Sequence, residues 1–248
     1  MTRTILVDGD IALYEVCKSC EVATDWGDDL WTLHCDLQEA TQKFDGWVAR
    51  VKERTEADKV VIALSGRQNW RKEVLPTYKH NRKPKRKPLA FKPLKEYVRE
   101  TYRTYEFENL EADDVLGLLA GDPGLGNIKG HKVIVTIDKD LMTIPGFHYY
   151  TNRPDDGIIQ VSQEQADFNH LLQSLAGDAT DGYSGCPGIG PVRAERVLLD
   201  SPCWAQVIEA YETAGLSEDD ALTQARVARI LRWGEYNIKT RKVKLWQP

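Results

Sequence analysis

Long apolar runs, paired cysteines and a charged leader are all missing from this sequence. No stretch approaches the roughly 18 consecutive apolar residues of a membrane-spanning helix, and no charged start followed by an apolar run predicts a signal peptide. Five cysteines, an odd number in a chain of 248 residues, do not resemble a disulfide framework. Such a pattern is typical of a reducing environment, so we expect a cytoplasmic protein without a membrane partner.

A zinc site has little support. Cys17 and Cys20 have CxxC spacing, and His34 and Cys35 follow them, so zinc binding is conceivable. However, Leu13, Cys17 and Cys20 also share one face of an expected helix. We interpret the two thiols as small buried side chains.

An excess of positive charge is also lacking, because the net charge is −5. The distribution is nevertheless uneven. Eleven lysines and arginines and a single acid, Glu73, lie between Arg67 and Lys95. Prolines interrupt the lysines from Arg82 to Pro93, so we expect a mobile or arched basic segment there, not a packed element.

Short apolar strands alternate with helical stretches along the first two thirds of the chain. This alternation predicts an α/β fold, a mostly parallel central sheet flanked by helices, in which ligands bind beyond the carboxyl ends of the strands. After about residue 163 the pattern becomes helical. We expect strands at 5–7, 60–64, 102–106 and 133–137, a strand pair at 147–150 and 158–161, and helices from 11, at 36–57 and at 111–120.

Acidic residues gather at four places, each at the end of an apolar strand or at the edge of a glycine turn. Brought into one crevice, so many like charges would repel one another unless cations neutralised them. Oxygen ligands suit magnesium or manganese and not zinc. Two such ions about 4 Å apart would activate a water and stabilise the leaving oxygen of a phosphodiester. The four groups are Asp8 with Asp10, Glu111 with Asp113 and Asp114, Asp138 with Asp140, and Asp178 with Asp181.

Gly188-Ile189-Gly190 forms a tight turn before a helix expected to start near Pro191. Such a turn presents backbone N–H groups at a helix N-terminus, a geometry that binds phosphate without reading bases. The alternative is a plain glycine-rich connection between helices.

Five motifs occur in the order found in the flap-endonuclease and 5′-exonuclease family, and the sequence resembles that family over nearly all of its length. The resemblance is greatest to its 5′→3′ exonucleases from T-seven-like phages. It includes the basic stretch 75–82 and continues to the last four residues, 245–248. The motifs are Val7-Asp8-Gly9, Glu111-Ala112-Asp113-Asp114, Thr136-Ile137-Asp138-Lys139-Asp140, Gly177-Asp178-Ala179-Thr180-Asp181-Gly182 and Gly185-Cys186-Pro187-Gly188-Ile189-Gly190.

The resemblance implies two Mg²⁺ or Mn²⁺ ions held by these carboxylates. Asp8, Glu111, Asp113 and Asp114 would hold or support the first ion, and Asp114, Asp138, Asp140, Asp178 and Asp181 would serve the second, some of them through water. Lys79 and Arg82 match a basic pair that grips the scissile phosphate, although Lys79 also fits a solvated lysine in a charge run. DNA would contact Lys83, Lys85, Arg86 and Lys87, and the turn Gly188, Ile189 and Gly190.

The implied organisation is a PIN-like nuclease core at 1–162, with a basic arch at about 76–96. A helix–three-turn–helix and C-terminal helices at 163–248 would complete the same globule. The resemblance implies a 5′→3′ exonuclease or flap endonuclease acting on double-stranded DNA with 5′ ends or flaps, in the host cytoplasm if a phage encodes it. We expect a monomer. RNA–DNA hybrids as substrates, and K⁺ at the helix–three-turn–helix, stay open.

One departure from the family concerns metal affinity. Many relatives carry an aspartate just after the second strand, whereas here the position falls near Gly66, which cannot ligate. The sequence therefore predicts an active enzyme that needs more magnesium, unless Asp10 enters the metal shell, and a lower magnesium requirement for Gly66→Asp.

Three alternative functions share parts of these patterns. A phosphatase of the haloacid dehalogenase type would use Asp8 as nucleophile and Asp10 as acid, but it leaves the Glu111 group unexplained. A DNA-binding module without catalysis would fit the gap at Gly66. An RNA-cutting relative in the PIN-like class would share the acids but not the helix–turn segment.

Overall fold

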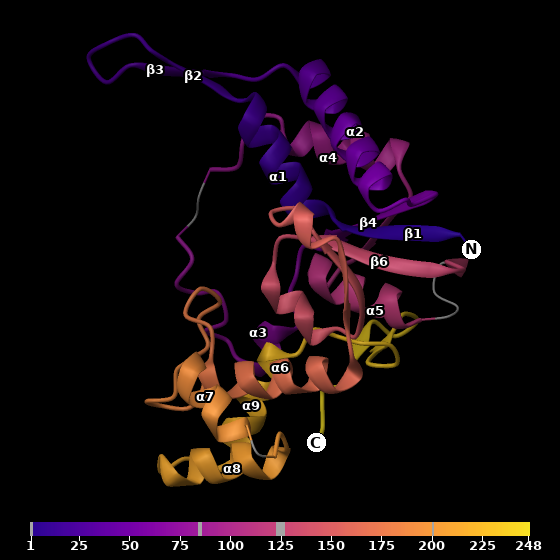
Figure 1. The fold of residues 1–248 in the computed structure, drawn as a ribbon. Coiled ribbons are helices and arrows are strands. Elements are labelled where there is room, and N and C mark those ends of the chain that lie inside the picture. Colours follow the sequence, from indigo (N-terminus) through magenta and orange to yellow (C-terminus); the bar gives the residue numbers. More distant parts are fainter. Residues whose placement is uncertain (1, 84–85, 123–126, 200) are drawn as a thin grey trace.

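A six-stranded sheet crosses the protein, which the computed structural model describes over residues 2–83, 86–122, 127–199 and 201–248 (Figure 1). The strand order is β5-β4-β1-β6-β7-β8, and β8 alone runs antiparallel to its neighbour. The predicted mostly parallel sheet is confirmed. The strands are β1 (Arg3–Asp8), β4 (Lys59–Ser65), β5 (Thr104–Phe107), β6 (His131–Thr136), β7 (Gly146–Tyr150) and β8 (Ile158–Val161).

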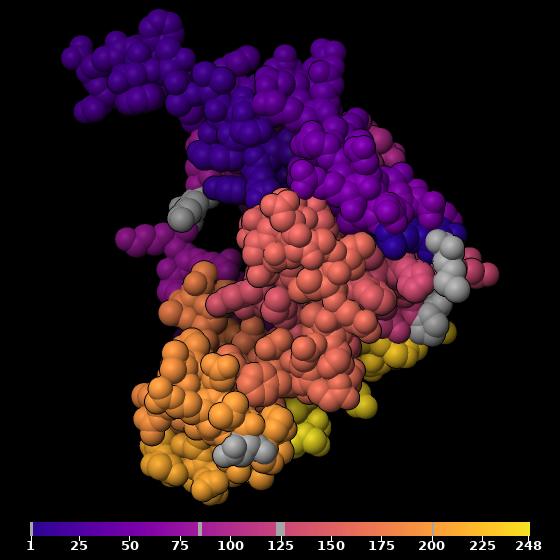
Figure 2. All heavy atoms as spheres, in the orientation of Figure 1, coloured from indigo at the N-terminus to yellow at the C-terminus, as the bar shows by residue number. Residues whose placement is uncertain are grey.

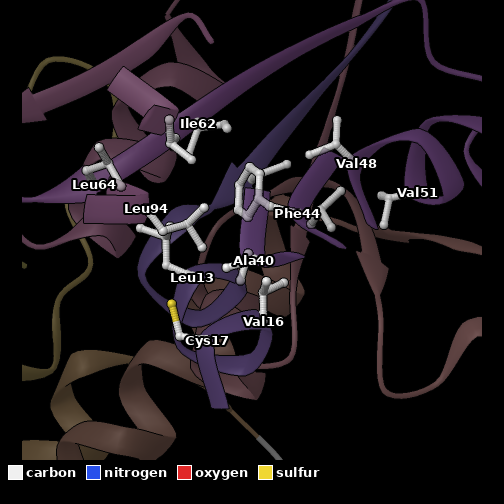
Figure 3. Packing of buried hydrophobic residues seen from close by; sticks show 14 of the residues in the cluster. Leu13, Val16, Cys17, Ala40, Phe44, Val48, Val51, Ile62, Leu64 and Leu94 are labelled. Carbon is white, nitrogen blue, oxygen red and sulfur yellow. The ribbon is translucent and has the colours of Figure 1, made fainter. Parts of the chain in front are cut away.

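Helices cover both faces of this sheet. Ile5 and Val7 of β1 pack on one side with α1 (Gly9–Cys20), α2 (Leu37–Arg54) and α4 (Phe91–Thr101). Figure 3 shows apolar side chains of these helices meeting those of β4. Leu6 points to the opposite face, where α5 (Ala112–Gly121) packs. Because both faces are buried, the central strands β1, β4 and β6 carry continuous and not alternating apolar runs.

A second group of helices packs around its own apolar core at the other end of the molecule (Figures 1 and 2). Its central side chains include Leu175, Val207 and Tyr211, all fully buried. The division of the chain at residue 162 stays a prediction. The helices are α6 (Gln163–Ala176), α7 (Pro191–Leu198), α8 (Trp204–Thr213) and α9 (Glu218–Ala228).

Two hairpins were not predicted. The strands β2 (Val22–Asp25) and β3 (Trp31–His34) pair outside the central sheet and expose every residue (Figure 1). Near the C-terminus, β9 (Tyr236–Asn237) pairs with β10 (Lys242–Val243). The first hairpin has no buried face and the second is very short, so neither produces the apolar alternation from which strands are predicted.

The end of the basic segment is corrected by the structure. The arch was expected to reach residue 96, but α4 begins at Phe91 and buries Phe91, Leu94 and Val98 in the core. Pro93 lies in the first turn of the helix, where its missing N–H costs little. Tyr78 is also buried, so it packs inside the protein, as Phe91 does, instead of offering a ring to bases.

Some smaller expectations are settled by burial. Cys17 and Cys20 are buried on α1, which confirms the interpretation as packed thiols. None of the helices in the described ranges is long and apolar enough to cross a membrane. Of the predicted DNA contacts, Lys85 lies outside the described residues.

Gly66 has a steric role that the sequence did not reveal. The chain after β4 runs close to the end of β5, with Gly66 N–H donating to the carbonyl of Leu110 at 2.9 Å. A Cβ at Gly66 would lie 2.1 Å from the carbonyl oxygen of Phe107 and 2.4 Å from that of Glu108. The expectation that Gly66→Asp supplies a metal ligand is therefore wrong in this fold, because the backbone leaves no room for the side chain.

We expect Gly66→Ala to lower the melting temperature, because the two carbonyls that its Cβ would meet belong to backbone that cannot move without disturbing β5. Gly46→Ala is the matched control. Gly46 lies inside α2, where a Cβ meets only the end of Arg50 at 3.5 Å, so this change should stabilise the fold by about 0.5–1 kcal/mol. Equal melting temperatures for the two variants would contradict the steric argument.

Candidate active site

A polar pocket of about 490 Å³ lies at the carboxyl ends of β1, β4 and β6. Adjacent parallel strands end at the same edge of a sheet, so acids that follow them meet there. The structure brings together most of the predicted site in this pocket. Its lining includes Asp8, Lys79, Arg82, Glu111, Asp113, Asp138, Asp140, Asp178 and Asp181.

Three of these carboxyls have raised pKa values, because they are buried and lie close to other acids. Burial, and then the negative charges of Asp10 and Asp138, raise the pKa of Asp8 to about 7. Burial and the charges of Asp8, Glu111 and Asp138 raise the pKa of Asp113 well above its usual value. Burial and Asp138 also raise the pKa of Asp140, to about 6. In the protein alone, the ionised forms of these groups are thus disfavoured.

Local structure holds the strand-end acids in place. Asp8 caps α1 by accepting the N–H of Ile11 at 3.3 Å, and it also accepts the hydroxyl of Thr136 at 3.2 Å. Asp138 accepts the N–H of Asp140 at 2.9 Å. A hydroxyl of β6 and backbone N–H groups just after each acid therefore orient Asp8 and Asp138.

Asp10 belongs to the pocket, although it was considered earlier only as a substitute ligand. Its Oδ2 accepts the N–H of Ser65 at 3.1 Å, and Lys95 lies 4.0 Å from its Oδ1. Asp10 thus lies beside the loop after β4, where the family aspartate is missing at Gly66.

Asp114 differs from the other acids, because it is fully buried and is not among the residues that line the pocket. Arg71 donates to both of its oxygens at 2.8 Å. The indole of Trp70 and the N–H of Leu231 each add a bond at 3.1 Å. With these donors in place, its oxygens are already committed. Of the two roles that the resemblance implied, holding the metal or supporting its site, this geometry favours support, through α5, and a part in metal binding stays a prediction.

Glu111, at the start of α5, faces two cations. Lys79 forms a short ion pair with it, and Arg71 lies 3.3 Å away. Burial alone would raise the pKa of Glu111, but the charges of Arg71 and Lys79 outweigh burial and lower it to about 2. The hydroxyl of Tyr78 bridges Glu111 and Asp181, at 3.1 and 2.8 Å.

The predicted basic pair is tied to the loop that carries Asp178 and Asp181. The N–H of Lys79 donates to the carbonyl of Asp181 at 2.7 Å, and its Nζ lies 3.4 Å from the carboxylate. Arg82 forms an ion pair with the same carboxylate. Lys79 and Arg82 therefore both reach the pocket, as predicted, and Asp181 positions them.

The predicted DNA contacts of the basic segment that the structure describes, Lys83, Arg86 and Lys87, do not line the pocket. Arg86 makes a bidentate ion pair with Glu21, whose side chain is 4% exposed and also accepts the N–H of Leu89 at 2.9 Å. Lys87 covers the ring of Phe91, 4.3 Å from its centre. Lys83 is exposed. Glu21 was not predicted, because it lies far from the basic segment in sequence.

The glycine turn lies where it was expected. Gly190 caps α7, and Gly188 has a φ of 73°, a conformation that favours glycine. Ile189 is buried in the core of the helical region, and its N–H already donates to the carbonyl of Cys186 at 3.1 Å. Ile189 therefore anchors the turn, and its N–H is not open to a phosphate.

The donor set fits divalent cations, although no finished site is present. Across the described ranges, no three His, Cys, Asp or Glu side chains converge closely enough to hold a metal. The donors that line the pocket are nevertheless carboxylate oxygens, and three of them have raised pKa values that a nearby cation would lower. Oxygen ligands and uncompensated negative charge are what magnesium and manganese require.

Comparisons with known proteins identify the family of the chain. Residues 3–165 match the family model described as 5′-3′ exonuclease, N-terminal resolvase-like domain. The exodeoxyribonuclease of Enterobacteria phage T3 is 31% identical over 98% of this chain and 92% of its own. The exonuclease of Escherichia phage T7 is 30% identical over 98% and 93%. The T5 D15 protein, co-crystallised with metal ions, has the same fold, with a TM-score of 0.67 over 91% of this chain and 88% of its own at 14% identity.

The chain therefore belongs to the 5′-3′ exonuclease family. This confirms the resemblance that the five motifs indicated.

Separate substitutions of Asp114 and Asp138 should distinguish an acid that supports the fold from one that is proposed to bind metal. We expect Asp114→Asn to lower the free energy of unfolding by about 3–5 kcal/mol, because it leaves the charge of Arg71 buried without a partner. Asp138→Asn should keep the stability of the parent, since an amide oxygen can still accept the N–H of Asp140. Chemical denaturation of both variants in metal-free buffer tests this difference. Unchanged stability of Asp114→Asn would show that the ion pair does not support the fold.

Proposed function

We propose that this protein hydrolyses DNA phosphodiesters from 5′ ends, with divalent cations held by the pocket carboxylates. Its membership of the 5′-3′ exonuclease family makes it a nuclease. The observation that carries the proposal is the pocket itself, in which acids from four separate parts of the chain meet Lys79 and Arg82. The phosphatase alternative accounts for Asp8 and Asp10 but gives no role to Glu111 and Asp113, which line the same pocket.

We assign the pocket carboxylates to two groups of ligands. Asp8, Glu111 and Asp113 would hold one Mg²⁺ or Mn²⁺ ion, with Asp10 in the place of the aspartate missing at Gly66. Asp138, Asp140, Asp178 and Asp181 would hold the other. Bound there, the ions supply a water of lowered pKa and stabilise charge on the leaving oxygen. Asp114 has no place in this set.

Lys79 is the residue that we assign to the scissile phosphate. It is positioned by Glu111 and Asp181, with Tyr78 beneath it at 5.0 Å from its Nζ to the ring centre. A cation held this firmly stabilises the charge that develops during in-line displacement without reorganising. Arg82, which is half exposed, would contact the same phosphate from the rim of the pocket.

DNA would be held outside the pocket by two surfaces. Lys83, Arg86 and Lys87 would attract the 5′ single strand, and Glu21 fixes the far end of this segment through Arg86. The start of α7, with Gly188 and Gly190, would contact duplex phosphates, and K⁺ there is an additional proposal. RNA–DNA hybrids as further substrates, and a monomeric state, belong to the same proposal.

The direct test uses the same duplex labelled at either 5′ or 3′ ends, a 5′ flap, and an RNA–DNA hybrid, each with and without magnesium. We expect mononucleotides or short products from 5′ ends and cutting at the flap, both only with magnesium. Product release from 3′ ends would overturn the proposed polarity. Binding without cleavage at any magnesium concentration would favour the non-catalytic alternative, and cleavage of RNA alone would favour the RNA-cutting one.

Lys79→Ala should reduce kcat by a factor of about 10²–10³ while changing DNA affinity little, because one phosphate contact among many adds little to binding. Lys92→Ala is the control, an exposed lysine on α4 close in sequence. Single-turnover kinetics and binding in calcium separate the two effects. A change in KM alone would show that Lys79 has no part in the chemical step.

Cleavage should also depend on the kind of cation. Magnesium and manganese should support catalysis, and calcium should support binding with little chemistry, because its longer bonds and looser shell misplace an in-line attack. Initial rates measured at saturating concentrations of each ion test this. Equal rates in calcium and magnesium would contradict a two-metal site.

A further inference from the structure

The hairpin formed by β9 and β10 carries a concentration of exposed positive charge that the catalytic pocket does not use. Lys239, Arg241, Lys242 and Lys244 are all exposed. Lys239, Lys242 and Lys244 line a cleft of about 820 Å³ together with Trp233, which is 57% exposed despite its size. Asp122 is the single acid among the described residues that line it.

This surface is fixed in place before any ligand binds. The side-chain oxygen of Asn237 accepts the N–H groups of Lys239 and Thr240, each at 3.0 Å, which holds the turn. Trp233 lies against the end of α5, where a Cβ at Gly121 would come within 2.9 Å of the Cβ of the tryptophan. An ordered platform loses little conformational entropy when it binds.

Lys242, in β10, and Lys244, just after it, point in the same direction. Val243 packs into the core beneath α5, so Lys242 and Lys244, on either side of it, project outward together. Two arginines that precede the hairpin in sequence already have acidic partners, because Arg229 pairs with Glu235 and Arg232 with Asp167.

The cleft continues into a second one, of about 630 Å³, with which it shares Lys242 and Val243. Arg226, Arg241 and Trp70 line this continuation. The helix α3 (Arg71–Val74) and α9 separate it from the catalytic pocket, because Arg71 and Val227 face that pocket. In Figure 1 the yellow segment that follows α9 passes next to α5 before it reaches the C-terminus.

We propose that this groove, formed by Trp233, Lys239, Arg241, Lys242 and Lys244, is a second DNA site that binds an unpaired strand. An exposed indole offers a stacking face to any base, and a row of cations follows the phosphates, which together are the two features of sequence-independent single-strand binding. An acidic peptide would satisfy the lysines but would leave the exposed indole without a comparable partner. The strand held here is not the one being cut, since α3 and α9 block the way to the catalytic pocket.

The test uses the full chain without divalent metal and an oligothymidylate carrying one 5-iododeoxyuridine. Irradiation should cross-link the oligonucleotide to the peptide that contains Trp233, as mapped by mass spectrometry. Trp233→Ala should weaken oligothymidylate binding at least about fivefold, and Trp233→Phe should restore most of it, because stacking needs only an aromatic face.

Two triple charge-reversal variants, one in the groove and one outside it, test the role of the lysines. Lys239→Glu, Lys242→Glu and Lys244→Glu together should lower the affinity for the oligonucleotide. The slope of log K against log salt should also become less steep by about 2, because each lost single-strand phosphate contact removes roughly 0.7. The matched control, Arg50→Glu, Arg54→Glu and Lys59→Glu, changes the net charge equally on exposed positions of α2 and β4. Its effect should be much smaller. Cleavage of a blunt duplex should stay at the parent rate in both, which separates this site from the proposed catalytic function.

Four outcomes would overturn the proposal. Cross-links confined to residues 79–95 would place all single-strand binding on the basic segment. Equal losses in the two triple variants would reduce the effect to net charge. Normal binding by Trp233→Ala would remove the stacking site, and equally strong competition by polyglutamate would indicate an acidic peptide as the ligand instead.

Discussion

The buried guanidinium of Arg71 joins the parts of the chain that surround the carboxylate pocket. It binds both oxygens of Asp114 on α5, and it donates to the carbonyls of Val227 and Arg229 at the end of α9, at 2.9 and 2.7 Å. A buried charge of this kind is costly unless all of its donors are satisfied. Because Glu111 begins α5, the position of its carboxylate, and through it of Lys79, depends on this ion pair.

Around this fixed centre the fold holds charges that repel one another. Burial first, and then that repulsion, raise the pKa values of Asp8, Asp113 and Asp140. Lys79 and Arg82 relieve part of it on the side of Glu111 and Asp181, whereas on the side of Asp8 a longer contact, of 4.0 Å, joins Lys95 to Asp10. Such an arrangement lowers the stability of the fold without cations and raises it when cations are bound, which is typical of a site shaped by function.

Sequence patterns predicted the sheet and most of the pocket, because buried parallel strands are continuous apolar runs and their last residues must meet at one edge. Asp8 and Asp138 could be found in this way. Asp114 could not be told from Asp113, since only the fold shows which acid faces Arg71. The steric need for Gly66 and the pairing of Glu21 with Arg86 depend on contacts between residues distant in sequence, which no local pattern records.

The central claim is that crowded carboxylates in one pocket require divalent cations. Thermal unfolding of the parent and of Asp8→Asn/Asp113→Asn, with magnesium or with sodium chloride at equal ionic strength, tests it most directly. We predict that magnesium raises the melting temperature of the parent until the site is saturated. At a magnesium concentration a hundred times Kd, the free energy of unfolding should increase by about 2.7 kcal/mol. The double variant should be more stable than the parent without metal and should gain little from magnesium. A parent that melts at the same temperature in both salts, or a variant that gains as much as the parent, would contradict the account.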